Sequence, residues 1–370
     1  MAIENWADIQ TDRICQSLKA PRGKITIGID GYIDEVWQVV SSRQSRADFT
    51  LYNKVKDFAK AVYDCGEGGY SNEIVRKRRT YGGFTANTGK AAGRLGCDIT
   101  FLGMFGLKAI DPAFKEFADT YRLISVGEPA VSQIFEFEDG KIMLPFIEDI
   151  MDFSWDSLVS AIAWEDLKAA YAEADMVALG YWSLMPAFDE IIAKLCENFL
   201  EGGSCKRVFF DFADIRKRDR HSLESTLQKL CVLNKKIPMT LSLNEHEAHL
   251  LFSYMGKDFT ENPANAEAET EYARQKIGLD ELIVHTPHFA VAASAGEGAA
   301  VVLQRYCEKP VITTGAGDNF NGGYMASCVC EGKLKLHERL LVGNATTGFY
   351  IRNGHSPDMA GICSELGAFQ

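Results

Sequence analysis

The sequence predicts an α/β protein built on a mostly parallel β-sheet with a small β-structured appendage. Short apolar or β-branched runs alternate with longer segments of helical periodicity, as expected where helices connect parallel strands. Residues 130–137 and 141–147 alternate in polarity on either side of Asp139-Gly140, which is a strong signal for a hairpin turn. With 370 residues, the chain is able to bury a large core, so we expect one large domain.

The expected strands are short and apolar, and the expected helices carry apolar residues at spacings of three and four. The strands cover residues 24–30, 99–105, 176–180, 207–212, 239–243, 281–285, 291–294 and 299–303. The helices cover residues 85–95, 112–121, 155–171, 186–199, 245–254, 263–277, 316–330 and 336–351. The appendage is assigned to residues 31–50, which look extended, and to the hairpin; a hairpin that only decorates the sheet edge is the alternative.

The composition excludes several classes of protein. A formal net charge of −12 argues against a nucleic-acid or anionic-membrane partner. The apolar runs are too short to span a bilayer, and Glu4, Asp8 and Asp12 replace the basic start of a secretory signal. The ten cysteines include no Cys-x-x-Cys pair, which is typical of reduced cysteines, so we expect a cytoplasmic protein.

Residues 313–323, Thr-Thr-Gly-Ala-Gly-Asp-Asn-Phe-Asn-Gly-Gly, form the most informative motif. Gly315, Ala316 and Gly317 precede a helical pattern, and small residues at such a turn let backbone N–H groups converge on an anion. Asp318 would repel a phosphate there, so its functional interpretation is a base that takes a proton from an attacking hydroxyl. The alternative is a tight helix entry whose first-turn acid is favoured by the helix dipole.

A second motif occupies residues 81–96. Gly82-Gly83 opens a helix, Asn87 lies one turn in, and Leu95-Gly96 ends the pattern. The double glycine lets a ligand approach the backbone, and the Asn87 amide offers a donor and an acceptor to a hydroxyl. In order and separation, the two motifs resemble the two signature regions of the ribokinase-like (PfkB) carbohydrate kinase family.

The resemblance implies a three-layer α/β/α sandwich that forms a single domain over residues 1–370. A β lid near residues 31–50 and 128–150 is implied to cover the sugar and to form a homodimer contact. Gly82, Gly83 and Asn87 are implied to bind a sugar or nucleoside, the amides of residues 315–317 to form an anion hole, and Asp318 to be the catalytic base. The family also uses ATP as phosphoryl donor and Mg²⁺ as cofactor.

Asp30 and Asp34 follow an expected strand, at the end where open α/β sheets place ligands. A carboxylate accepts two hydroxyl hydrogen bonds, which suits a vicinal diol of a sugar. By resemblance, Asp34 matches the family's early substrate-binding aspartate, and Asp30 is a second candidate. Ordinary loop acids are the alternative.

Asn244 and Glu247 resemble the family's Asn-x-x-Glu motif, in which the pair organises magnesium beside the nucleotide phosphates, largely through water. The same two residues fit a helix capping box, and both interpretations hold if the helix starts at the site. Thr314 and Asn344 are further residues implied on the nucleotide side. Asn344 lies in a segment of small residues, for which an ordinary core helix is the alternative.

Three features depart from the family pattern. His285-Thr286-Pro287 replaces a Thr-x-Gly turn, and proline removes a backbone donor, so the usual phosphate-cradling turn is not expected. Ile312 replaces an aspartate linked to a monovalent cation, so potassium activation of the usual type is not expected. Residues 54–79 are extra length whose role the sequence leaves open.

These patterns predict an ATP-dependent kinase that phosphorylates a primary hydroxyl of a sugar or polyol. Phe84 and Thr85 bring no positive charge after the double glycine, which favours an unphosphorylated acceptor. A nucleoside kinase of the same fold is an alternative, and a sugar- or nucleotide-binding protein without turnover is a third hypothesis. A Rossmann dehydrogenase is disfavoured because no Gly-x-Gly-x-x-Gly follows the first strand.

Overall fold

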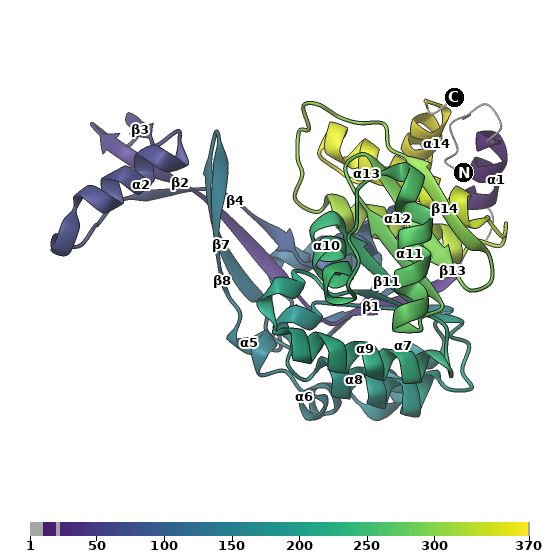
Figure 1. Ribbon diagram of the computed structural model, residues 1–370. Coiled ribbons are helices and arrows are strands. Elements are labelled where there is room, and N and C mark those ends of the chain that lie inside the picture. Colours follow the sequence, from purple (N-terminus) through teal and green to yellow (C-terminus); the bar gives the residue numbers. More distant parts are fainter. Residues whose placement is uncertain (1–9, 20–22, 369–370) are drawn as a thin grey trace.

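Two β-sheets organise residues 10–19 and 23–368, which the computed structural model describes (Figure 1). Glu4 and Asp8 of the acidic N-terminus lie outside these residues. Over the described chain, the larger sheet has nine strands in the order β14-β13-β12-β11-β10-β9-β1-β5-β6. These are β1 (Lys24–Gly28), β5 (Asp98–Gly103), β6 (Arg122–Ser125), β9 (Met176–Gly180), β10 (Arg207–Asp211), β11 (Met239–Asn244), β12 (Glu281–His285), β13 (Phe289–Ser294) and β14 (Gly298–Leu303).

The larger sheet is parallel from β6 to β12 and antiparallel at the β13–β14 edge. Neighbouring residues of a strand point to opposite faces, so Val177 of β9 packs in one apolar core and Ala178 in the other. Helices cover both faces, and the predicted three-layer α/β/α sandwich is confirmed. The parallel strands therefore end together along one edge, where the two motifs meet.

The helices divide between the two cores. On one face lie α6 (Trp155–Ala161), α7 (Trp164–Ala172), α8 (Phe188–Leu195), α9 (Arg220–Asn234), α10 (Glu245–Tyr254) and α11 (Pro263–Ile277). On the other lie α1 (Thr11–Lys19), α3 (Phe84–Arg94), α4 (Lys115–Thr120), α12 (Ala316–Cys328), α13 (Leu336–Asn353) and α14 (Met359–Gly367). The short helix α5 (Glu148–Met151) follows the smaller sheet in sequence.

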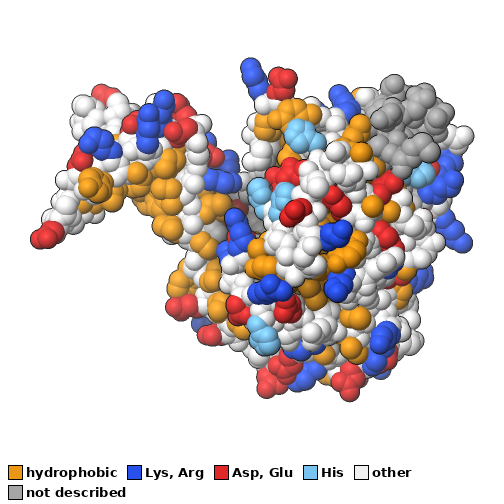
Figure 2. All heavy atoms as spheres, in the orientation of Figure 1, with side chains coloured by type: hydrophobic (Ala, Val, Ile, Leu, Met, Phe, Trp, Pro, Cys, Tyr) orange, Lys and Arg blue, Asp and Glu red, His pale blue; other side chains and the backbone are white. Residues whose placement is uncertain are grey.

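The smaller sheet, which we call the lid, extends to one side of the body (Figure 1 and Figure 2). It contains β2 (Tyr32–Arg43), β3 (Phe49–Leu51), β4 (Ile74–Gly82), β7 (Ala130–Phe137) and β8 (Gly140–Phe146). The predicted segments 31–50 and 128–150 supply four of these strands. The extra residues 54–79 add α2 (Val55–Asp64) and most of β4, which pairs antiparallel with β2.

The predicted single helix over residues 155–171 is wrong. Ile162 and Ala163 have extended backbone ψ angles of 143° and 138°, and they separate α6 from α7. This break allows both Trp155 and Trp164 to pack against Phe199, with ring centroids 6.3 and 4.8 Å away. Tertiary packing has overridden the continuous helical pattern.

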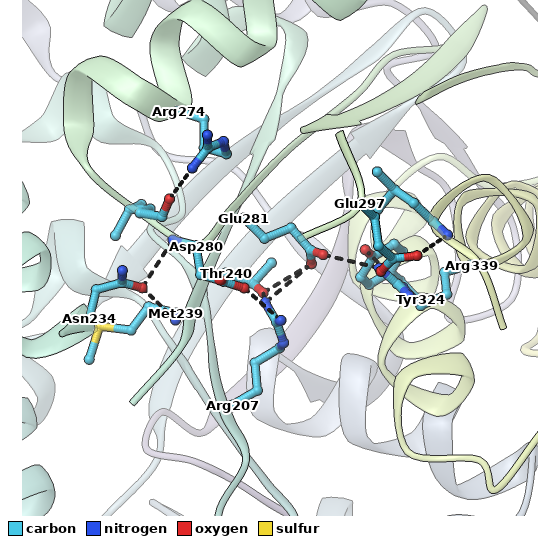
Figure 3. Close-up of polar contacts among 12 residues, drawn as sticks. Arg207, Asn234, Met239, Thr240, Arg274, Asp280, Glu281, Glu297, Tyr324 and Arg339 are labelled. Atoms are coloured by element: carbon cyan, nitrogen blue, oxygen red, sulfur yellow. Dashed lines mark hydrogen bonds and ion pairs between the residues drawn. The ribbon is translucent and has the colours of Figure 1, made fainter. Parts of the chain in front are cut away.

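A polar network closes the sheet at the amino ends of its strands (Figure 3). Glu281 is almost fully buried at the start of β12, where its carboxylate accepts from the Thr240 hydroxyl at 3.0 Å and pairs with Arg339 of α13 at 3.2 Å. Arg207 of β10 pairs with Asp280 at 2.7 Å. These contacts tie α13 to three parallel strands at the edge opposite the motifs. Among the described residues, none of the helices has the length and apolar character needed to cross a membrane.

Candidate active site

A pocket of about 730 Å³ lies between the lid and the body of the protein, where α3, the loop before α12 and the end of α13 form its wall. Its wall includes Asp34 from β2, Asn87 from α3 and Thr314 from the loop before α12. These residues come from three separate predicted motifs. The structure therefore brings both sides of the predicted site to one cavity.

Asp318 and Asn87 contact each other across the base of this site. The Asn87 amide donates to one carboxylate oxygen of Asp318 at 2.9 Å, and the Thr88 hydroxyl donates to the other at 3.4 Å. The approach of α3 to α12 requires Gly322, because a Cβ there would lie 2.5 Å from the Ala91 Cβ. Small residues in the two helices thus position the acceptor motif against the candidate base.

The environment of Asp318 favours its neutral form. The side chain is half-buried, and burial followed by the charge of Asp211 raises its pKa to about 7. The Asn87 and Thr88 hydrogen bonds oppose this rise. A carboxyl with this pKa is able both to accept a proton and to release it near neutral pH.

The loop before α12 is held in a defined shape. Gly315 has a left-handed φ of 82° and is the N-cap of α12, a conformation that favours glycine. The Tyr350 hydroxyl donates to the Thr314 carbonyl at 2.7 Å. Of the three amides predicted to form the anion hole, that of Ala316 donates to the Thr313 carbonyl at 3.1 Å, so in this structure it is engaged within the loop.

The double glycine makes room for two carboxylates. A Cβ at Gly82 would lie 2.7 Å from an Asp34 carboxylate oxygen, and a Cβ at Gly83 would lie 2.1 Å from one of Asp30. Asp34 is half-buried and open to the pocket, and burial raises its pKa to about 6. Asp30 is fully buried and accepts from the backbone amide of Thr85 at 3.0 Å, near the start of α3. The two aspartates therefore differ: Asp34 faces the cavity, whereas Asp30 anchors a helix terminus.

Asn244 and Glu247 form the capping box of α10, with reciprocal hydrogen bonds of 2.9 and 3.0 Å. The Glu247 carboxylate is nonetheless buried, and its pKa is raised well above the usual range by burial and then by the charge of Asp211. Asp211 accepts from the Asn321 amide of α12 at 2.7 Å. The capping interpretation is confirmed, whereas the magnesium role stays a prediction that the position of the helix start at the carboxyl edge allows.

This acidic pair fits a magnesium ion bound largely through water. A divalent cation near Glu247 and Asp211 would relieve the repulsion that raises the Glu247 pKa. Among the described residues, no three Asp, Glu, His or Cys side chains gather closely enough to hold a metal directly. Magnesium retains several waters and needs few protein ligands, which suits so sparse a set.

His285 lies beside the start of α12. It pairs with Asn244 across β11 and β12, its ring lies 5.0 Å from that of Phe320, and a Cβ at Gly317 would lie 3.0 Å from its Cε1. Burial lowers its pKa to about 4, so the imidazole is neutral at pH 7. The sequence analysis treated this position only as a departure from the family pattern, yet the structure places it at the candidate phosphate end.

Asn344 is bonded within the fold. Its side chain is buried, and its amide donates to the carbonyls of Val302 and Leu303 at 3.1 and 3.3 Å. These bonds fasten α13 to β14. The nucleotide-binding role of Asn344 stays a prediction, because the amide would have to exchange these partners for a ligand.

Lys141 was missed by the sequence analysis. It follows the hairpin turn Asp139-Gly140, and its amino group donates to the Thr314 hydroxyl across the pocket. Its position after the turn was the signal available, but a lysine at a hairpin tip is ordinarily a solvated charge.

The chain is a carbohydrate kinase of the ribokinase-like (PfkB) class. Its α/β/α sandwich with a lid and its similarity to known kinases define this class. Escherichia coli phosphofructokinase-2 with substrates and products has this fold, with a TM-score of 0.63, 12% identity, and coverage of 94% of this chain and 99% of that one. Xylella fastidiosa fructokinase with bound ATP gives a TM-score of 0.60 at 15% identity, covering 94% of this chain and 98% of that one. Methanocaldococcus jannaschii nucleoside kinase gives a TM-score of 0.59 at 16% identity, covering 94% of this chain and 99% of that one.

Sequence comparison identifies the family within this class of kinases. The model of the prokaryotic ketohexokinase family matches residues 7–369. A ketohexokinase from Haloferax volcanii is 28% identical over 339 residues, which cover 90% of this chain and 88% of that protein. The chain belongs to the prokaryotic ketohexokinase family.

Proposed function

We propose that this protein transfers the γ-phosphoryl group of ATP to a primary hydroxyl of a ketohexose. The observation that carries the proposal is the Asp318–Asn87 contact at 2.9 Å, at the meeting point of the lid pocket and the α12 N-terminus. Membership of the ketohexokinase family supports the acceptor class.

Asp34 and Asn87 would hold the sugar, because both lie on the pocket wall and offer complementary hydrogen-bonding groups to a diol. Asp318 would take the proton of the attacking hydroxyl. As the new O–P bond forms, the bond from the γ-phosphorus to the leaving oxygen of ADP breaks. The positive end of α12 and the glycine-rich loop would stabilise the charge on the transferred group.

Asn244, Thr314 and His285 would face the nucleotide phosphates. A bound Mg²⁺ would neutralise phosphate charge, and Glu247 with Asp211 would hold its water shell. Because His285 is neutral at pH 7, it would contribute a hydrogen bond rather than a charge. Catalysis would rest mainly on positioning and electrostatics.

The test is ADP formation from ATP and magnesium with ketohexoses, aldohexoses, pentoses and nucleosides as acceptors. Strong turnover confined to ketohexoses is the expected result. Turnover confined to nucleosides would establish the alternative nucleoside kinase. Thermal stabilisation by sugars with no turnover would instead indicate a binding protein.

We also propose a homodimer formed through the lid. Strand β8 ends the described order of the lid sheet, and its Met143, Leu144 and Phe146 are 43, 58 and 56% exposed. An exposed apolar edge strand is a surface that proteins ordinarily cover. Light scattering should give a dimer mass for the wild type and a monomer mass for Leu144→Glu. Val232→Glu on α9, where Val232 is also 58% exposed, serves as the matched control.

A further inference from the structure

We propose that Lys141 is a phosphoryl-binding residue, carried into the active site by the lid and positioned by the extra segment 54–79. The inference rests on the proposed kinase function. It assigns a role both to a side chain outside the predicted motifs and to a segment whose purpose the sequence left open.

The Lys141 amino group lies beside the loop that precedes α12. It donates to the hydroxyl of Thr314, the residue immediately before the Gly315 N-cap of α12. Its charge also acts on Asp34, whose pKa it lowers against the effect of burial. A group near both residues lies between the acceptor side of the pocket and the loop expected to receive the phosphoryl group.

Lys141 differs from two other cations of the pocket in having no acidic partner. Lys90 pairs with Glu116 at 2.8 Å and Arg78 with Glu136 at 3.7 Å, whereas Arg94 donates to the Ser356 carbonyl at 2.7 Å. Within the described part of the chain, no carboxylate forms an ion pair with Lys141, which holds only a neutral hydroxyl. Such an ammonium, beside the N-terminus of α12, is suited to bind a phosphoryl oxygen.

The carboxylates near the pocket favour a positive charge in this position. Asp34 lines the pocket together with Lys141, and the Asp318 carboxylate contacts Asn87, which also lines it. A transferring phosphoryl group adds further negative charge to this environment. Lys141 would offset part of this charge from the lid side of the pocket.

The extra segment supports the hairpin tip. The Val55 amide at the start of α2 donates to the Asp139 carboxylate at 2.9 Å, and the Glu138 amide donates to the Asn53 carbonyl at 2.8 Å. Phe58 of α2 stacks on Phe137 of β7, with ring centroids 5.7 Å apart. These contacts flank the turn that presents Lys141, so α2 would fix the direction in which the lysine points.

The decisive measurement is the binding of a non-hydrolysable ATP analogue and of ADP, in the presence of sugar and magnesium, to wild type and Lys141→Met. If Lys141 binds the γ-phosphoryl group, Lys141→Met weakens analogue binding about tenfold or more, leaves ADP binding within about twofold, and lowers kcat about 100-fold. Lys141→Arg should recover part of kcat. Equal weakening of analogue and ADP, or a kcat within threefold of wild type, would overturn the proposal.

Controls separate this role from two others. Lys77→Met removes a lid lysine that pairs with Glu136 and should leave every constant unchanged. Phe58→Ala should reproduce the selective loss of analogue affinity. The double variant Phe58→Ala/Lys141→Met should bind the analogue as tightly as Lys141→Met alone. Additive losses of affinity would contradict the positioning of Lys141 by α2. If the wild type itself lacks turnover with every acceptor, the proposed function fails, whereas an active wild type with an unaffected Lys141→Met isolates the failure to Lys141.

Discussion

The side chain of Asn87 in α3 donates a 2.9 Å hydrogen bond to the carboxylate of Asp318 in α12, across 231 positions of sequence. The contact joins the motif expected to bind the sugar to the residue expected to act on it. It also lowers the pKa of Asp318 against the effects of burial and of Asp211. The Asn87 amide therefore affects both the expected position of the acceptor and the proton affinity of Asp318.

Replacing Asn87 should affect both. In Asn87→Ala the Asp318 pKa should rise further, so that kcat at pH 7 falls about tenfold, in keeping with the loss of a hydrogen bond to a charged group. Acceptor KM should rise as well. Thr88→Val removes the longer 3.4 Å bond and should produce a smaller shift in the same direction. A pH profile unchanged by Asn87→Ala would contradict this account of the contact.

The wild-type pH dependence follows from the raised pKa of Asp318, about 7. A base must be ionised to accept a proton, so kcat/KM for the sugar should rise with pH through about 7 and level off above it. Measurement from acidic to alkaline pH at saturating ATP and magnesium checks this. A profile that is flat across neutrality would show that Asp318 is not the titrating base.

Glu247→Gln should weaken the response to magnesium without unfolding α10. Glutamine also serves in a capping box, so the helix start is retained, while the buried charge is lost. We expect the magnesium concentration for half-maximal activity to rise about tenfold or more. Glu245→Gln on the same helix is the control. An unchanged magnesium titration would leave Glu247 with its capping role alone.

Substitutions should show that Asp34 binds the acceptor and that Asp30 has a structural role. Asp34→Asn should raise acceptor KM by about 10- to 100-fold with little change in the KM for ATP, because a charge-assisted hydrogen bond to a sugar hydroxyl is lost. Asp30→Ala should mainly lower Tm, since alanine removes the acceptor of the Thr85 amide in a fully buried position. Initial-rate kinetics and thermal unfolding of both variants test the distinction; a large KM effect of Asp30→Ala at unchanged Tm would reverse it.

The sequence was sufficient to predict the layered fold and three of the residues that line the pocket, Asp34, Asn87 and Thr314. Asp318 and Asn87 were found because glycine-rich helix starts have a recognisable composition. Their mutual contact was not predictable, since it depends on the close approach of α3 and α12 at Gly322. Strand β4 escaped detection because its charged residues 76–79 are largely exposed and lack polar–apolar alternation. The contact of Asn344 with β14 was not predictable, because a helix of small residues has the same composition whether it packs on a nucleotide base or on a strand.

The central claim is that Asp318 is the proton acceptor of a sugar kinase, and Asp318→Asn tests it most directly. The variant should fold: the Asp318 pKa is raised from 3.8 to about 7, so ionisation over that range destabilises the native state, and Tm at pH 8 should equal or exceed that of wild type. Sugar affinity, measured by calorimetry, should stay within about threefold, while kcat falls by about three orders of magnitude. A folded Asp318→Asn protein with near-full kcat on the same ketohexose would contradict the account.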